Sequence, residues 1–146
     1  TNLIAEDDIK YISSDIYLMT HTTNPLLSLK SIEQSIETFS DALKTNKYDS
    51  LFTVNKIQTR FYDKNVKPLN HDPDNLIRTQ DLEPWYEENS NLYLFTKEGF
   101  HKTRSRIGSN PMMFETPLFE SIDIDTPDDW EIAEVLVNKY KSKGIL

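Results

Sequence analysis

Short apolar runs alternate with helix-like spacings of apolar residues along this chain. The run Ile16–Thr20 carries no charge and predicts a strand buried on both faces, as in a parallel sheet under helices. Downstream, four apolar residues recur at helical intervals: Ile32, Ile36, Phe39 and Leu43. They predict a helix, and Ser31 with Gln34 has the spacing of a capping box at its start. Ser50–Lys56 returns to strand character, so the order predicts the βαβ unit of a layered α/β domain.

The segments around this unit are less regular. Residues 2–12 have an approximate helical spacing, whereas Asn, Pro and His residues interrupt the pattern from Ile57 to Glu88. The interruption predicts a hairpin or extended excursion from the sheet. Asn91–Thr96 predicts a strand and Lys97–Ser105 a short helix, and Pro111–Phe114 precedes a further brief apolar strand.

The last helix has the clearest signals. Thr126 can cap it, Pro127 suits its first turn, and two aspartates follow that favour the positive end of the helix dipole, Asp128 and Asp129. Four residues share the face that we expect to be buried: Trp130, Ala133, Val137 and Tyr140. Gly144 is expected to stop the helix.

Composition narrows the class of protein. The 146 residues suit a single domain, 1–146, and 37% of them are hydrophobic, enough for a buried core. A net charge of −8 argues against a nucleic-acid partner. No apolar run approaches the roughly 18 residues of a membrane span. The absence of cysteine fits a cytoplasmic protein, and three glycines are too few for a glycine-rich phosphate loop.

Asp123-Ile124-Asp125 is the sharpest chemical feature. We assign Ile122 and Ile124 to a strand, on which residues i and i+2 point to the same side. Two carboxylates so placed at a strand end can hold one Mg²⁺, which needs few protein oxygens. The alternative is that Asp125 caps a turn while Asp123 is solvated.

Basic residues suggest an anion site. His101, Lys102, Arg104 and Arg106 gather in one short segment, and Arg78 stands alone upstream. Guanidinium groups bind carboxylate and phosphate in bidentate fashion. A charged, solvated helix face explains residues 97–106 equally well.

Four segments occur in the order of a known family: Ile16–Leu27 (IYLMTHTTNPLL), Arg78–Leu82 (RTQDL), Asn89–Phe95 (NSNLYLF) and Glu120–Val135 (ESIDIDTPDDWEIAEV). Together they resemble the acylneuraminate cytidylyltransferases, the CMP-sialic acid synthetases. The resemblance implies a Rossmann-like nucleotidyltransferase sheet in three αβα layers. It also implies a cytoplasmic homodimer that transfers CMP from CTP to an acidic sugar, a sialic acid-like nonulosonic acid, with release of pyrophosphate.

The resemblance also implies site residues. Asp123 and Asp125 match the family's catalytic carboxylates that bind Mg²⁺. The substrate-binding positions that match are His21, Thr23, Asn24, Arg78, Gln80, Asn89 and Tyr93. The excursion 57–88 corresponds to the family's dimerisation arm, which also contributes to sugar binding.

Three departures from the family pattern change the expectation. His21 replaces a glutamine and Ser90-Asn91 replace Gly-Ala, so the sugar can differ from sialic acid. The family's N-terminal third, with its glycine-rich basic loop for CTP, has no counterpart here, so the chain resembles the C-terminal two-thirds. A non-catalytic fragment that binds a sugar acid or dimerises is therefore the alternative to an active enzyme.

Overall fold

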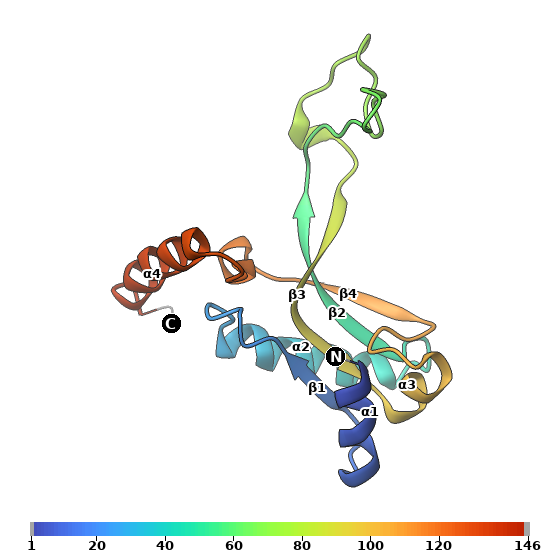
Figure 1. The fold of residues 1–146 in the computed structure, drawn as a ribbon. Coiled ribbons are helices and arrows are strands. Elements are labelled where there is room, and N and C mark those ends of the chain that lie inside the picture. The colour runs from blue at the N-terminus through green and yellow to red at the C-terminus, as the bar shows by residue number, and fades with distance from the viewer. Residues whose placement is uncertain (1, 145–146) are drawn as a thin grey trace.

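A mixed four-stranded sheet forms the centre of the computed structural model, which describes residues 2–144 (Figure 1). The strands are β1 (Tyr17–Thr20), β2 (Ser50–Ile57), β3 (Trp85–Phe95) and β4 (Pro111–Glu115). Their order across the sheet is β1-β3-β2-β4. β2 and β4 pair in parallel, whereas β3 runs antiparallel to both of its neighbours. The brief strand expected after residues 111–114 is formed by those residues themselves.

Helices precede, separate and follow the strands. They are α1 (Asn2–Tyr11), α2 (Leu29–Leu43), α3 (Lys97–Thr103) and α4 (Pro127–Lys141), with 3₁₀ turns at Thr79–Asp81 and Leu118–Ser121. The sequence predicted all four helices, but not the start of α2. Ser28 rather than Ser31 is its N-cap, because the Ser28 hydroxyl accepts the Ser31 N–H at 3.1 Å. No helix within residues 2–144 has the length and apolar character needed to cross a membrane.

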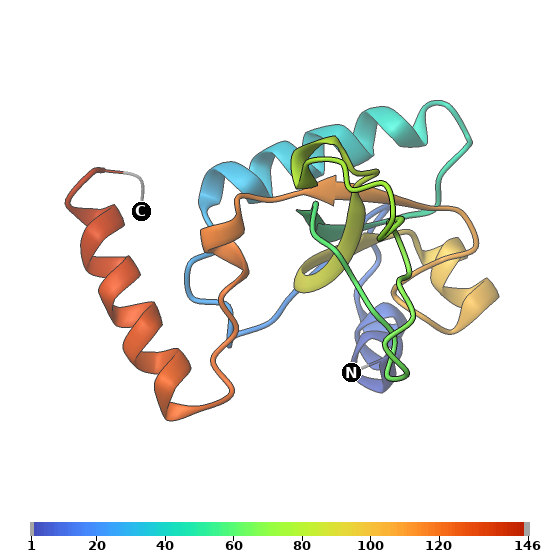
Figure 2. The same cartoon turned by 90° about the horizontal axis from the view of Figure 1, so that it is seen from above.

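Alternate side chains of β3 build two apolar cores. Leu92 and Leu94 point to α2 and pack with Phe39 and Leu51. The intervening residues point to the opposite face, where the cluster comprises Ala5, Ile9, Tyr93, Phe95 and Phe100. Burying each large side chain contributes about 1.5–3 kcal/mol. Figure 2 shows α2 on one face of the sheet and α1 with α3 on the other, which confirms the expected αβα layers.

β1 differs from its prediction as a strand buried on both faces. It pairs only with β3, antiparallel, and forms one edge of the sheet in the described residues. Leu18 remains 41% exposed. β1 and β2 run in the same direction around α2, but β3 lies between them. An apolar run of this length does not distinguish an edge strand from a central one.

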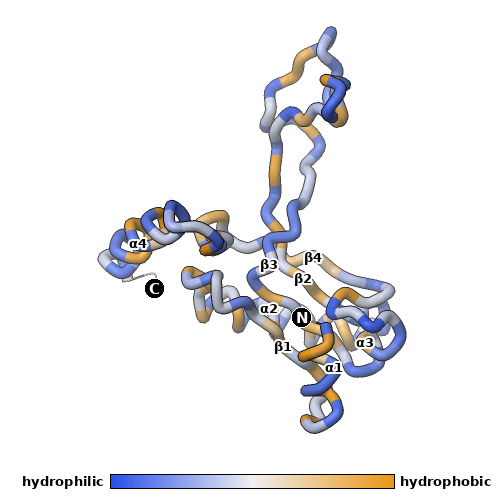
Figure 3. The backbone as a smooth tube through the Cα atoms, in the orientation of Figure 1, coloured by the Kyte–Doolittle hydropathy of each residue, from blue (hydrophilic) through white to orange (hydrophobic). Residues whose placement is uncertain are grey.

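Residues 58–84 form an arm that projects from the far ends of β2 and β3 (Figure 1). Local contacts hold it together: Phe61 stacks on Trp85 at 5.1 Å, and the Gln58 amide donates to the backbone oxygens of Gln80 and Leu82. Apolar residues lie among hydrophilic ones along the arm in Figure 3. The excursion expected over 57–88 spans 58–84 in the structure, because Ile57 belongs to β2 and residues 85–88 belong to β3.

α4 begins as predicted but does not cover the sheet. The Thr126 hydroxyl and the Asp129 carboxylate form a reciprocal capping box, with Pro127 in the first turn. The predicted buried face is confirmed for Ala133 and wrong for Trp130, which is 62% exposed, while Val137 and Tyr140 are half-buried. α4 extends away from the sheet (Figures 1 and 2), so most of its apolar side chains have no layer to pack against.

Candidate functional site

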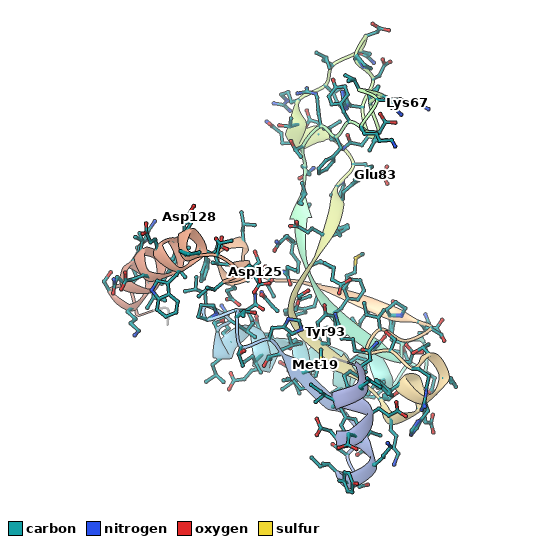
Figure 4. The ribbon with its side chains drawn as sticks, in the orientation of Figure 1. Met19, Lys67, Glu83, Tyr93, Asp125 and Asp128 are labelled. Carbon is teal, nitrogen blue, oxygen red and sulfur yellow. The ribbon has the colours of Figure 1, made fainter. Side chains whose placement is uncertain are left out.

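The loop after β1 and the segment after β4 meet beside the sheet. The Ile124 N–H donates to the Thr23 backbone oxygen at 2.9 Å, and the Asn24 side-chain amide donates to the Ile122 oxygen at 3.4 Å. Carboxyl ends of parallel strands are where ligands bind in open α/β sheets. These contacts bring five predicted site residues into one region: His21, Thr23, Asn24, Asp123 and Asp125. Figure 4 shows Asp125 between α4 and the sheet.

Asp123 and Asp125 lie on an irregular segment, so their assignment to a strand is wrong. Two hydrogen bonds, from Ile124 to Thr23 and from the Asn24 side chain to Ile122, hold this segment instead of a ladder, and α4 begins directly after it. Asp123 is half-buried, and its Oδ1 atom has no hydrogen-bond partner. Asp125 is exposed, and its N–H donates to the Asp129 carboxylate at 3.2 Å.

The Asp123 oxygen without a partner suits a cation, because a buried carboxylate is normally paired. Mg²⁺ fits two carboxylates, since it keeps several of its waters. No cluster of three or more potential metal-binding side chains occurs within the described residues. Carboxylate oxygens are donors that suit Mg²⁺, whereas protein zinc sites favour nitrogen and sulfur ligands.

Tyr93 is fully buried and anchors a polar cluster. Its hydroxyl donates to Glu88, lies 3.1 Å from Ser90 Oγ and accepts from Arg106 Nη2 at 3.2 Å. Burial, followed by the hydrogen bond to Glu88, raises the pKa of Tyr93, against smaller opposing effects of Ser90 and Arg106. The His21 ring lies 6.1 Å from the Tyr93 ring, and its buried Nε2 has no partner.

Asn89 belongs to an amide cluster where β3 loses its regular pairing with β2. The register jumps between the pairs Phe52–Tyr93 and Val54–Glu88, and Ser90 adopts a left-handed φ of 58°. A glycine adopts this conformation at less cost than a serine does. The Asn89 amide donates to Asn55 Oδ1 at 2.9 Å and to Thr116 Oγ1 at 2.8 Å.

Arg78 and Gln80 lie apart from the other predicted site residues. Both belong to the arm, which begins beyond Trp85. Trp85 pairs with Ile57 and Tyr93 with Phe52, so five residues of β2, about 17 Å, separate the root of the arm from Tyr93. The Arg78 guanidinium is 72% exposed and binds Asp81 through two contacts of 2.8 and 3.2 Å. One copy of the chain therefore does not bring these two residues to the carboxylates.

Two acidic residues that shape the site were not among those predicted from the sequence. Glu88 accepts the Tyr93 hydrogen bond, and Glu120 is buried at 2% exposure, where its carboxylate accepts from the N–H and hydroxyl of Ser28. Glu120 thus ties the start of α2 to the segment that leads to Asp123. Its place inside the ESIDID segment was the available signal, whereas nothing in the sequence distinguished Glu88.

A cavity of about 660 Å³ lies at the opposite ends of the strands, between the end of α2 and the start of α3. Residues that line it include Asp49, which precedes β2, and Thr96, which follows β3. None of its lining side chains has a buried polar atom without a partner. Apart from Asn2 in α1 and Arg60 in the arm, the side chains with a buried unpartnered polar atom within the described residues are His21, Asn24, Asn91, Arg106 and Asp123. They favour the region around His21 and Asp123 as the candidate site.

Comparison with known proteins gives the fold. No protein-family model and no curated protein matches the sequence. The structure resembles the crystal structure of 4-diphosphocytidyl-2C-methyl-D-erythritol synthase from Anaerococcus prevotii, with a TM-score of 0.64 and 12% identity. The match covers 94% of this chain but only 66% of that one. The chain therefore shares the α/β, Rossmann-type fold of that protein.

Proposed function

We propose that the whole protein transfers CMP from CTP to a hydroxyl group of an acidic sugar and releases pyrophosphate. The observation that carries the proposal is the fold, which is shared with an enzyme named as the synthase of a diphosphocytidyl compound. Two carboxylates and a loop of polar side chains at the carboxyl ends of strands support it. The acidic sugar, of the sialic acid class, rests on the family resemblance of four segments of the sequence.

Asp123 and Asp125 would hold Mg²⁺. The ion would offset the charge of the triphosphate, which two bare carboxylates would repel. The unpartnered Oδ1 of Asp123 supports this assignment, because such an oxygen is costly to bury without a ligand.

The loop from His21 to Asn24 would position the acceptor. Asn24 is buried, its amide is fixed on Ile122, and its Oδ1 has no partner, so it can accept a hydrogen bond from a sugar hydroxyl. The reacting hydroxyl would attack the α-phosphorus in line, and the bond from that phosphorus to pyrophosphate would break. Positioning and electrostatics supply most of the acceleration in such transfers.

Arg78 and Gln80 would reach an acceptor only from the arm of a second copy. Their distance from Tyr93 along β3 supports this part of the proposal, which makes the active form a homodimer. Thr23, Asn89 and Tyr93 would complete the acceptor side, with Asn89 acting through the backbone around Ser90.

The glycines favour a second candidate function for the 146-residue chain itself, binding of a sugar acid without catalysis. Gly99 and Gly108 both pack against Asp49, and Gly144 lies just after α4. The described residues therefore contain no glycine-rich loop to hold a triphosphate. On this reading the chain binds the acceptor and releases no pyrophosphate.

Pyrophosphate release by the full-length gene product tests the proposal. CTP, Mg²⁺ and N-acetylneuraminic acid together should release it, whereas ATP or omission of the sugar acid should not. Asp125→Asn should lower turnover by several orders of magnitude. Asp128→Asn, an exposed neighbour in the first turn of α4, is the matched control and should retain activity. Sugar-acid binding without pyrophosphate release from any nucleotide would favour the second function.

A further inference from the structure

Arg106 is a largely buried cation with few partners. Its side chain is 21% exposed, in a chain of net charge −8. The guanidinium carbon lies 4.2 Å above the centre of the Tyr93 ring, and Nη2 donates to the Tyr93 hydroxyl. The Nε–H is buried and has no partner among the described residues. A guanidinium offers five N–H donors, so this one is incompletely satisfied.

Glu88, the acidic residue beside Arg106, does not satisfy the remaining donors of the guanidinium. Glu88 Oε1 lies 3.7 Å from Arg106 Nη2, beyond hydrogen-bond distance, and the same oxygen accepts from Tyr93. Arg104, two residues earlier, contrasts with this arrangement. Its side chain is exposed and pairs with Glu6 at 2.7 Å, as an ordinary surface ion pair does.

We propose that Arg106 is the anion-binding residue of the candidate site and takes an oxyanion of the ligand, a carboxylate or a phosphate. The stacking on Tyr93 fixes the plane of the guanidinium, so that its free donors are oriented before the anion arrives. His21, which contacts the same ring, places this group beside the loop that would hold the acceptor. The inference rests on the proposed function only for the ligand that supplies the oxyanion.

Glu88 competes with the ligand in this arrangement. Its carboxylate is 3.7 Å from the Arg106 guanidinium, too far for a hydrogen bond. An incoming oxyanion that binds at hydrogen-bond distance therefore replaces it as the partner of the guanidinium. Neutralising Glu88 should therefore tighten anion binding. A purely structural role of Arg106, as a support for Tyr93, predicts no such gain.

Isothermal titration of the 146-residue chain tests the assignment with three probes: N-acetylneuraminic acid, its methyl ester and CMP. We expect wild type to bind the acid roughly ten- to hundredfold more tightly than the ester. Arg106→Gln should abolish this preference and Arg106→Lys should keep part of it. Arg104→Gln, which removes the same charge two residues away, should keep all of it. Glu88→Gln should bind the acid severalfold more tightly.

The probes separate the two sources of the oxyanion. If a phosphate is the partner, Arg106→Gln loses CMP affinity by the same factor, while the acid and the ester bind wild type equally. A shift of the Arg106 Nε–H resonance on titration supports either case and does not depend on overall stability. Equal affinities of folded wild type and Arg106→Gln for all probes, or no binding by wild type, would overturn the assignment. Binding that depends on Arg106 without pyrophosphate release in the full-length protein would leave it standing while the proposed function falls.

Discussion

Asp123 keeps one carboxylate oxygen out of solvent and without a hydrogen-bond partner. Burying such an acceptor costs free energy, and a charged one costs more than a neutral one. The segment that carries Asp123 is hydrogen-bonded to Asn24, whose Oδ1 is also buried and without a partner. Two unsatisfied acceptors in neighbouring segments are what a site has when its ligands are hydrogen-bond donors or cations.

We predict that Asp123→Asn stabilises the fold while it weakens the response to Mg²⁺. An amide removes the buried charge, so the free energy of unfolding should rise by about 0.5–1 kcal/mol. Millimolar Mg²⁺ should raise the Tm of wild type but not of Asp123→Asn, as measured by thermal unfolding with and without the ion. Asp128→Asn should respond as wild type does. An equal rise for Asp123→Asn would contradict the assignment of this carboxylate.

Gly108 is required by the close approach of Asp49. A Cβ atom at this position would lie 2.2 Å from Asp49 Oδ1, and the two carboxylate oxygens accept the N–H groups of Ser109 and Asn110. Gly108→Ala should therefore lower the free energy of unfolding by about 1–3 kcal/mol in urea titration. Ser109→Ala, which keeps the backbone donor, should change it little. A small effect of Gly108→Ala would mean that the Asp49 side chain can move at no cost.

Elements differ in how well the sequence predicted them. The periodicity of α2 and the capping signals of α4 are local, and both helices form where they were expected. The burial of a strand or a helix face depends on neighbours that local patterns do not specify. The errors on Leu18 and Trp130 have this origin, since β1 lies at an edge and α4 extends from the sheet.

The candidate site was predictable only in part, for the same reason. The loop at His21 and the acidic pair near Ile124 lie in segments with family character, and the structure brings them together. Arg106 belongs to a charged segment in which sequence alone does not separate it from Arg104. The stacking on Tyr93 makes that distinction, and it requires the tertiary structure.

The start of α4 should be sensitive to acid. Hydrogen bonds from Thr126, first from its hydroxyl and then from its N–H, hold the pKa of Asp129 below its ordinary value of 3.8. Because the folded-state pKa is the lower one, the stabilisation is present above pH 3.8 and is lost as the pH falls below it. Hydrogen exchange of α4 amides, corrected for intrinsic rates, should show less protection at pH 3 than at pH 5. Asp129→Asn should remove this dependence and Asp128→Asn should keep it; a flat profile in wild type would refute the prediction.

At the scale of the whole molecule, two elements project from the sheet in different directions, the arm and α4 (Figure 1). Both carry exposed apolar side chains. Those on the arm include Val66, Leu69, Leu76 and Ile77, and those on α4 include Trp130, Ile132 and Val135. Apolar side chains exposed together are typical of surfaces that associate with another chain.

We predict that the arm is the dimer interface. Leu76→Asp combined with Ile77→Asp should weaken self-association at least tenfold in sedimentation velocity experiments, because buried charge at an apolar interface is costly. Ile132→Asp with Val135→Asp, the equivalent pair on α4, should leave the dimer intact. Dissociation caused by the α4 pair alone would move the interface to that helix, and a monomeric wild type would exclude the arm as a contact.

Bending of β3 at its irregular stretch, Asn89 and Ser90, would displace the whole arm. Ser90 lies opposite the gap between Phe52 and Val54 in the pairing register, and Trp85 pairs with Ile57, so the two residues are about 13 Å apart. A turn of about 10° at Ser90 would displace the root of the arm by about 2 Å. The bending point is linked to the candidate site, because the Asn89 amide donates a hydrogen bond to Thr116, from which the chain continues to Asp123. We infer that a partner bound to the arm acts on this segment through Asn89 and Thr116, so that dimerisation and the geometry of the two carboxylates are linked.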